Sequence, residues 1–171
     1  NMGSAFAKRL QGFDVKVSEV HGMSQRGGSV VTYVKYGDKV YSPVIEKGEA
    51  DAIISFEQLE GARWMSYLKK GGKLIVSTQK TDPMPVITGV AKYPEEIIEK
   101  IKAEDIDVIA VDALSLAEGL GNAKASNVVI MGVVSKILDF EDKYWQKAIE
   151  ECVPAKFLEL NKKAFELGKN I

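Results

Sequence analysis

The 171-residue chain is long enough for one globular domain with a full hydrophobic core, and its 46% hydrophobic and 27% charged residues are ordinary for such a domain. Its net charge of −1 gives no electrostatic case for binding nucleic acid, and no apolar run reaches the length of a membrane span. One cysteine and one histidine are too few to ligate an iron–sulfur cluster or a zinc ion within the chain. The single cysteine, Cys152, excludes an internal disulfide and fits a reducing cytoplasm.

The first part of the chain predicts a helix followed by extended structure. Residues 1–10 have helical apolar spacing, and Gly12 ends this helix as a C-cap. Strands are predicted over residues 13–20 and 29–36, with a polar, glycine-rich loop between them. Residues 39–42 resume the extended pattern after a short turn. We therefore expect residues 29–42 to form a hairpin, which gives the sheet an antiparallel part.

The middle of the chain predicts a strand–helix–strand unit. Residues 52–56 form a short apolar run typical of a central parallel strand. Residues 57–68 have the spacing of an amphipathic helix, which Gly71-Gly72 would stop, and residues 73–77 predict the next strand. Such a unit predicts a parallel sheet with a right-handed crossover.

Further α/β alternation follows. Residues 81–85 contain two prolines and are not expected to form regular structure. Pro94 is predicted to open a helix that runs to residue 101, with acidic residues in its first turn. Residues 107–111 predict another buried strand, and residues 112–117 a helix that starts at its carboxyl end.

The last third of the chain leaves one segment open. Residues 127–135 are rich in β-branched side chains, which favours a strand, but they are apolar on every side, which favours a buried helix. Pro154 is predicted to open the final helix. Together the elements predict a three-layer, Rossmann-like α/β fold, with a mainly parallel sheet, an antiparallel hairpin contribution and helices on both faces. Without an internal repeat or linker, residues 1–171 are predicted to form a single domain.

The loop between the first two strands is the main candidate for function, because loops on a rigid scaffold commonly carry it. Its glycines allow positive φ angles and close approach to a ligand or another chain. Arg26 offers a cationic fork that suits a phosphate or a carboxylate, or is a solvated surface charge. His21 is a candidate base or ligand group, or a residue that hydrogen-bonds nearby backbone. The candidate ligand- or partner-binding loop comprises His21, Gly22, Met23, Ser24, Gln25, Arg26, Gly27 and Gly28.

Secondary candidates lie elsewhere in the chain. Glu57 ends a strand and opens a helix, where α/β sheets place ligand contacts, but an acidic residue there also suits the helix dipole. Asn122 and Asn127 flank a glycine-rich break and are either secondary ligand contacts or local turn and cap residues. Ser24 has no histidine or acid at a diagnostic spacing for a hydrolase triad. Cys152, among apolar neighbours, is expected to be packed. No catalytic residue and no metal ligand is assigned.

The sequence also resembles a known family. The octapeptide at 21–28, His-Gly-Met-Ser-Gln-Arg-Gly-Gly, preceded by Asp-Val-Lys-Val-Ser-Glu-Val, resembles the gamma-type domain of 2-oxoacid (pyruvate, ketoisovalerate, indolepyruvate) ferredoxin oxidoreductases. Within that family it looks most like the beta subunit of the indolepyruvate type. The likeness continues through Tyr41-Ser42-Pro43, Glu49-Ala50-Asp51 and Glu57 to the end of the chain.

The resemblance implies a subunit of a thiamine-diphosphate-dependent complex that decarboxylates a 2-oxoacid, transfers the acyl group to coenzyme A and reduces ferredoxin. It places the thiamine diphosphate, magnesium and iron–sulfur clusters in a larger partner subunit, through which ferredoxin is met. It also implies a helix over residues 127–135. The net charge and the short apolar runs predict neither nucleic acid nor a membrane as a partner, and the single cysteine predicts a cytoplasmic location. The chain alone would be inactive.

Family members usually begin one strand earlier, with a Gly-x-Gly-Gly-Gln-Gly turn that this sequence lacks. Gly3 is a possible remnant of that turn, but a lone glycine is a weak signal, and we expect no nucleotide to bind there. The alternative is a stand-alone nucleotide-binding α/β domain without oxidoreductase activity.

Overall fold

The computed structural model describes residue 9 and residues 11–21, 30–138 and 140–171. The chain forms two compact units, each built from two separate stretches of sequence. Unit 1 contains Asn1–Ile45 and Ser135–Lys162, and unit 2 contains Glu46–Val134 and Lys163–Ile171. The helix predicted over residues 1–10 lies, apart from residue 9, outside the described residues.

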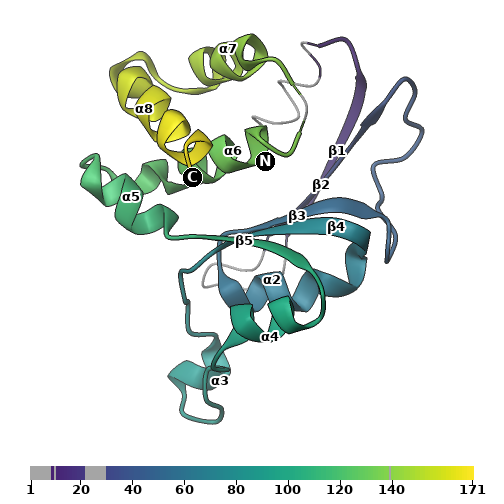
Figure 1. Cartoon of the computed structure of the whole chain (residues 1–171), viewed down its shortest axis with the longest axis vertical. Helices are drawn as coiled ribbons and strands as arrows, with labels where there is room; N and C mark the ends of the chain where they lie inside the picture. The colour runs from purple at the N-terminus through teal and green to yellow at the C-terminus, as the bar shows by residue number, and fades with distance from the viewer. Residues whose placement is uncertain (1–8, 10, 22–29, 139) are drawn as a thin grey trace. The chain divides into compact units, whose positions relative to one another are not determined.

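Unit 1 contains a long antiparallel hairpin formed by β1 (Asp14–His21) and β2 (Val30–Gly37), which pair along their whole length (Figure 1). The predicted antiparallel part of the fold is confirmed, but the hairpin predicted over residues 29–42 was wrong, because β2 pairs with β1 and not with residues 39–42. The side chain of Asp14 accepts the Val40 N–H at 2.9 Å, so this donor is used by a carboxylate and not by a strand. That hydrogen bond, together with Lys16 at 3.2 Å, holds the pKa of Asp14 below its usual value.

A row of aromatic rings fixes the base of this hairpin to the rest of unit 1. The Phe13 and Tyr36 rings meet edge to face at 5.8 Å, and Tyr36 meets Phe140 in the same way at 6.3 Å. Phe140 then stacks at 5.2 Å on Trp145, which is completely buried. Such ring pairs add to the free energy gained by burying their surface, so the hairpin has a firm support at one end.

Helices complete unit 1. α7 (Asp142–Cys152) buries Trp145, Ala148 and Ile149. The short helix η3 (Ala155–Phe157) follows and precedes α8 (Leu158–Lys169). The second half of α8 belongs to unit 2. Pro154 therefore precedes a 3-10 turn and not the α-helix itself.

The prediction that Cys152 is packed was wrong, because its side chain is exposed. It continues the apolar stripe of α7, but as the last residue of the helix it lies beyond the core.

Unit 2 is built on a parallel sheet with the strand order β3-β4-β5. The strands are β3 (Ala50–Ser55), β4 (Leu68–Ser77) and β5 (Asp107–Val111), and they are parallel throughout. The central strand carries three consecutive residues with no exposed surface, Leu74, Ile75 and Val76. Since successive side chains point to opposite faces, both faces of the sheet are covered.

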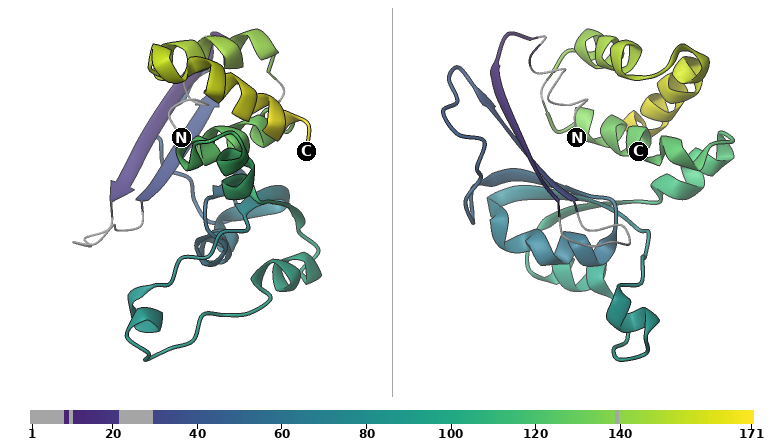
Figure 2. Two further views of the ribbon diagram at one scale, coloured as in Figure 1. Left: turned by 90° about the vertical axis from the view of Figure 1, so that its left-hand side faces the viewer. Right: turned by 180° about the vertical axis from the view of Figure 1, so that it is seen from behind.

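Helices lie on both sides of this sheet, as predicted (Figures 1 and 2). α2 (Gln58–Trp64), continued by η1 (Met65–Tyr67), and α4 (Ile97–Ala103) cover one side, where Leu74 and Val76 pack against the isoleucines of α4. α5 (Ala113–Gly119), η2 (Ala123–Ala125) and α6 (Ser126–Ser135) follow β5, with α5 and α6 on the other side. The mixed α/β fold with parallel and antiparallel parts is confirmed.

Three local predictions in unit 2 were wrong. Gly71 and Gly72 lie inside β4, where the pairing shifts between Ala50 and Ala52, so the glycines form a bulge and not a helix stop. Gly71 has φ +78°, which only glycine adopts readily. Met84–Ile87 form a one-turn helix, α3, because Pro85 stands in the first turn, where the missing N–H costs nothing. α4 begins at Ile97 and not at Pro94.

The segment that was ambiguous by its residues is the helix α6. Every residue from Val128 to Val134 is buried, and this all-round burial explains why the segment shows no amphipathic pattern. The resemblance, which implied a helix, gave the right assignment.

Candidate functional site

Residues 22–29, which we call the signature loop, connect the two strands of the hairpin of unit 1 at its far end. His21 is the last residue of β1 and pairs with Val30, the first residue of β2, so residues 22–29 join the two strands directly. Eight residues in each strand place His21 and Val30 roughly 25 Å from the base of the hairpin. Gly22, Met23, Ser24, Gln25, Arg26, Gly27 and Gly28 lie outside the described residues. The two strands therefore lead directly into and out of the loop, and the role of the loop stays a prediction.

His21 is the one candidate of the loop that the structure describes. Its side chain is 67% exposed, and its Nε2 lies 3.7 Å from the carboxylate of Glu19, two residues earlier on the same face of the strand. The imidazole thus stands in solvent at the end of β1, beside the Glu19 carboxylate.

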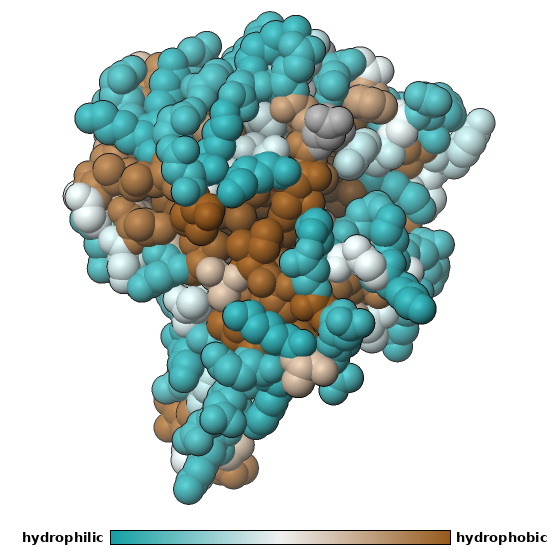
Figure 3. Space-filling model, in the orientation of Figure 1, coloured by the Kyte–Doolittle hydropathy of each residue, from teal (hydrophilic) through white to brown (hydrophobic). Residues whose placement is uncertain are grey.

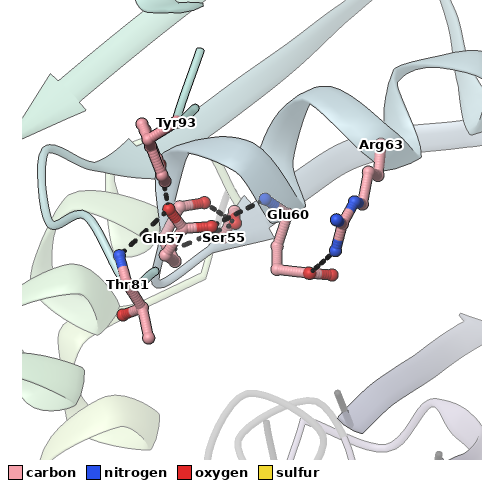
Figure 4. Close-up of polar contacts among 6 residues, drawn as sticks. All are labelled: Ser55, Glu57, Glu60, Arg63, Thr81 and Tyr93. Atoms are coloured by element: carbon pink, nitrogen blue, oxygen red, sulfur yellow. Dashed lines mark hydrogen bonds and ion pairs between the residues drawn. The ribbon is translucent and has the colours of Figure 1, made fainter. Parts of the chain in front are cut away.

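Glu57 lies at the carboxyl end of β3, and its carboxylate gathers three hydrogen bonds (Figure 4). One oxygen accepts the Glu60 N–H at 2.8 Å, which makes Glu57 the N-cap of α2. The other oxygen accepts the Thr81 N–H at 3.4 Å and the Tyr93 hydroxyl. Glu57 is thereby engaged in holding its own unit together, at the start of a helix where the sequence also suggested a local role for an acidic residue.

These contacts join segments that are distant in sequence. Thr81 follows β4 and Tyr93 precedes α4, so a single carboxylate ties the two ends of the intervening segment 82–92 to the start of α2. Partial burial, and then the hydrogen bond to the negatively charged Glu57, raise the pKa of Tyr93 well above its usual value. The Tyr93 hydroxyl therefore stays protonated and donating across the physiological pH range. We call this group of Glu57, Thr81 and Tyr93 the Glu57 clasp.

We expect Tyr93→Phe to lower the free energy of unfolding by about 1 kcal/mol at pH 7, because it removes a hydrogen bond to a partly buried carboxylate. The effect should depend on pH. The folded-state pKa of Tyr93 is raised, so its stabilising contribution is complete below the unfolded-state pKa of about 10 and is lost as the pH rises above that value. Urea unfolding of the wild type and of Tyr93→Phe between pH 7 and 11 should show that the difference between their free energies of unfolding narrows above pH 10. A difference that stays constant across this range would contradict the assignment, and Tyr41→Phe, at an exposed tyrosine, is the control.

The other polar residues at this edge of the sheet also have local partners. The Ser55 hydroxyl donates to the Glu57 carbonyl at 2.6 Å, and the buried Gln58 amide donates to the Thr78 carbonyl at 2.5 Å. The Ser77 hydroxyl accepts the Gln79 N–H, and Asp112 accepts the Ser115 N–H at 3.1 Å as the N-cap of α5. The carboxyl ends of the strands, where α/β sheets place ligands, are thus built from side chains that shape the backbone.

Asn122 and Asn127 are not brought to Glu57. Asn122 accepts the Lys124 N–H at 3.0 Å and caps the short helix η2. Asn127 is exposed in the first turn of α6. No hydrogen bond joins either asparagine to Glu57 in the part of the chain that the structure describes, so the three predicted secondary contacts do not form one cluster.

Sequence reasoning missed the partners of Glu57. Tyr93 lies 36 residues away and Thr81 lies 24 residues away, and neither separation has a periodicity that would pair them with Glu57. The segment 82–92 with its two prolines was the only signal, since a long loop inside a compact unit needs ties at its ends. Within the described residues, no three His, Cys, Asp or Glu side chains gather in a way that could hold a metal ion.

The sequence matches the family model described as pyruvate ferredoxin/flavodoxin oxidoreductase over residues 2–171. The chain belongs to this family. It is 41% identical over 162 residues to the indolepyruvate oxidoreductase subunit IorB of Pyrococcus horikoshii, covering 92% of this chain and 80% of that one. The family resemblance predicted from the sequence is therefore confirmed.

Solved structures share the fold. A keto/oxoacid ferredoxin oxidoreductase gamma subunit from Geobacter sulfurreducens superposes with a TM-score of 0.70 at 22% identity, over 99% of this chain and 86% of that one. A 2-oxoglutarate:ferredoxin oxidoreductase from Magnetococcus marinus matches 98% of this chain with a TM-score of 0.68 at 16% identity, but only 27% of its own length. In that protein the fold is one part of a much longer polypeptide.

The stretch that the family model matches contains the hairpin, residues 22–29 and the Glu57 clasp of this oxidoreductase family member. None of the described helices combines the length and apolar character that crossing a membrane requires.

Proposed function

We propose that this chain is the gamma-type subunit of a thiamine-diphosphate-dependent 2-oxoacid:ferredoxin oxidoreductase of the indolepyruvate type. The complex would oxidatively decarboxylate an aryl 2-oxoacid, form the acyl-coenzyme A and reduce ferredoxin. The observation that carries this proposal is the 41% identity with an indolepyruvate oxidoreductase subunit over 92% of the chain. The same family membership disfavours a stand-alone nucleotide-binding domain.

The redox chemistry belongs to a larger partner subunit. An iron–sulfur cluster needs about four cysteine ligands, whereas the whole chain has one cysteine and one histidine. His21 is exposed on β1 and Cys152 is exposed at the end of α7, so the two sit on different elements. We therefore assign thiamine diphosphate, magnesium and the clusters to the partner subunit, with ferredoxin docking there. The single cysteine also fits the reducing cytoplasm in which we place the complex.

Within the complex, the contribution of this chain is to bind and to position. We propose that residues 1–171 act as one gamma-type domain and that the loop His21–Gly28 contacts the partner subunit or coenzyme A. A glycine-rich loop lets backbone N–H groups approach a phosphate, and the Arg26 fork would pair with a phosphate or a carboxylate. Glu57 would act indirectly, by holding the carboxyl edge of the sheet, and Asn122 by capping η2, whereas Asn127 is exposed and would be a secondary contact.

Reconstitution with the larger subunit tests the proposal. Indolepyruvate-dependent and coenzyme A-dependent reduction of ferredoxin should appear only when both subunits are present, and neither chain alone should support it. The rates of ferredoxin reduction with pyruvate, 2-oxoisovalerate and 2-oxoglutarate, compared with the rate with indolepyruvate, would show which 2-oxoacid the complex uses. If the chain instead binds a mononucleotide tightly and never assembles with a thiamine-containing subunit, the stand-alone domain is the correct interpretation.

The purified chain by itself is expected to bind neither iron nor thiamine diphosphate. The physical reason is the shortage of ligands in the full sequence. Metal analysis by mass spectrometry and calorimetric titration with thiamine diphosphate and magnesium measure both. Iron at one or more equivalents per chain, or thiamine diphosphate bound at micromolar concentration, would show that the cofactor assignment is wrong.

A further inference from the structure

A loop projects from unit 2 between β4 and α4, and its tip is apolar. We call residues 82–92 the apolar arm, which includes α3 (Figures 1 and 2). Three large side chains of the arm are exposed: Met84 by 46%, Ile87 by 64% and Val90 by 82%. In Figure 3 brown side chains stand at the end of this projection among teal ones. Clustered apolar groups on a soluble protein mark an interaction site more often than scattered ones do.

The arm is ordered by its own hydrogen bonds. The Thr88 N–H and hydroxyl both donate to the Met84 carbonyl at 2.9 Å. The N–H groups of Val90 and Ala91 both donate to the Pro85 carbonyl, also at 2.9 Å. These bonds use the backbone of the arm and leave its apolar side chains directed outward. The arm is therefore a compact Ω-type loop and not an unstructured connection.

The base of the arm is also held by side-chain contacts. Thr81 enters the arm and Tyr93 leaves it, and both bind the same Glu57 carboxylate, while the Lys80 ammonium lies 5.7 Å from the centre of the Tyr93 ring. Because both ends are fixed, little conformational entropy remains to be lost when the tip binds a partner. An exposed apolar tip on a pre-ordered support has the properties of a binding anchor.

The size of the tip decides which partner it suits. Three exposed side chains offer on the order of a few hundred Å², whereas a stable interface between two copies buries about 800 Å² on each. The tip is too small to dimerise the chain and suits a partner that is held by other contacts as well. In the Magnetococcus marinus protein the same fold is 27% of one long polypeptide, so there it is held to a larger body.

We propose that the apolar arm anchors this chain by inserting Met84, Ile87 and Val90 into an apolar pocket on the larger subunit of the oxidoreductase. The inference rests on the proposed function. The charged residues of the arm, Asp82 and Lys92, are of opposite sign and exposed, so they give no net electrostatic attraction. The contribution of the arm to binding should therefore be insensitive to salt.

The test compares two double variants of the full chain. Ile87→Ser/Val90→Ser removes apolar surface from the arm, and Tyr41→Ser/Val44→Ser removes side chains that are 89% and 50% exposed in unit 1. Affinity for the purified larger subunit is measured by biolayer interferometry in 50 mM and 500 mM NaCl. We expect the arm variant to bind at least tenfold more weakly at both salt concentrations and the control to bind like the wild type. Melting temperatures verify folding, and Val90→Ser alone, at the most exposed position, replaces the double variant if that variant is unstable.

The outcomes separate this inference from the proposed function. If the wild-type chain does not bind the larger subunit, the proposed function fails. If the wild type binds and the arm variant binds equally well, the anchor is wrong although the function stands. An arm variant that loses only self-association, as measured by sedimentation, would assign the arm to a second copy of the chain and also overturn the proposal.

Discussion

Replacing Gly168 by alanine is expected to lower the free energy of unfolding by about 3 kcal/mol or more. A Cβ atom at this position would lie 1.8 Å from the Val129 carbonyl oxygen and 3.1 Å from the Gly132 Cα. Gly168 is in α8 and its obstacles are in α6, so the two helices cross in backbone contact within unit 2. No change of side-chain rotamer relieves a clash with backbone atoms, and the helices would have to move apart.

Gly132 is the other half of this crossing and should be equally intolerant. A Cβ atom there would meet the Phe165 carbonyl oxygen at 2.1 Å and the Lys169 backbone nitrogen at 2.8 Å. Gly119→Ala, at the end of α5, is the matched control, because nothing lies within 4 Å of the added atom. The control should be stabilised by about 0.5–1 kcal/mol through the better helix propensity of alanine. Urea unfolding monitored by circular dichroism measures all three, and a Gly168→Ala protein as stable as the control would contradict the close crossing.

Arg26→Ala is expected to lower the activity of the reconstituted complex by more than tenfold and to leave this chain folded. The glycines around Arg26 give the loop little anchoring of its own, so an exposed ion pair there would contribute only about 0–1 kcal/mol to stability. If Arg26 instead pairs with a desolvated phosphate or carboxylate at a subunit junction, losing the guanidinium would weaken the free energy of binding by roughly 2–5 kcal/mol, because the partner charge is left buried and unpaired.

Two measurements check the Arg26 prediction. The melting temperature of the isolated chain reports on folding, and 2-oxoacid-dependent ferredoxin reduction at several coenzyme A concentrations reports on the loop. Lys35→Ala is the control, since it removes a charge from the same hairpin at a residue that pairs with Lys16, away from the loop. Activity that is unchanged at every coenzyme A concentration, with unchanged assembly, would mean that Arg26 is a surface charge.

The alternation of short apolar runs with amphipathic stretches was sufficient to predict the α/β class. Residues 73–77 and 107–111 are strands in the structure because their consecutive apolar side chains must be covered on both faces of a sheet. The octapeptide at 21–28 identified the family by type and spacing of residues alone. The ligand count of the full sequence likewise assigned the redox cofactors to another subunit, which stays a prediction for reconstitution to test.

The strand partners could not be predicted locally. The sequence predicted that residues 29–36 would pair with 39–42, whereas β2 pairs with β1 across the signature loop. Both arrangements satisfy the period of two, and in the structure the Val40 N–H, which a strand over residues 39–42 would use, donates to the Asp14 carboxylate instead. Gly71-Gly72 could not be assigned locally either, because the sequence predicted that they stop a helix, whereas they lie in a bulge of β4.

The sequence by itself determined the class of fold, the family and the position of the signature loop, because these depend on local periodicity and on a contiguous string of residues. Only the tertiary structure decided what Glu57 does, since Thr81 and Tyr93 reach it from 24 and 36 residues away. The crossing at Gly132 and Gly168 and the outward-facing tip of the apolar arm were likewise invisible in the sequence. The physical reason is common to all three: a glycine, a carboxylate or a valine has the same local preferences whatever packs against it, and its role is set by neighbours that only folding brings close.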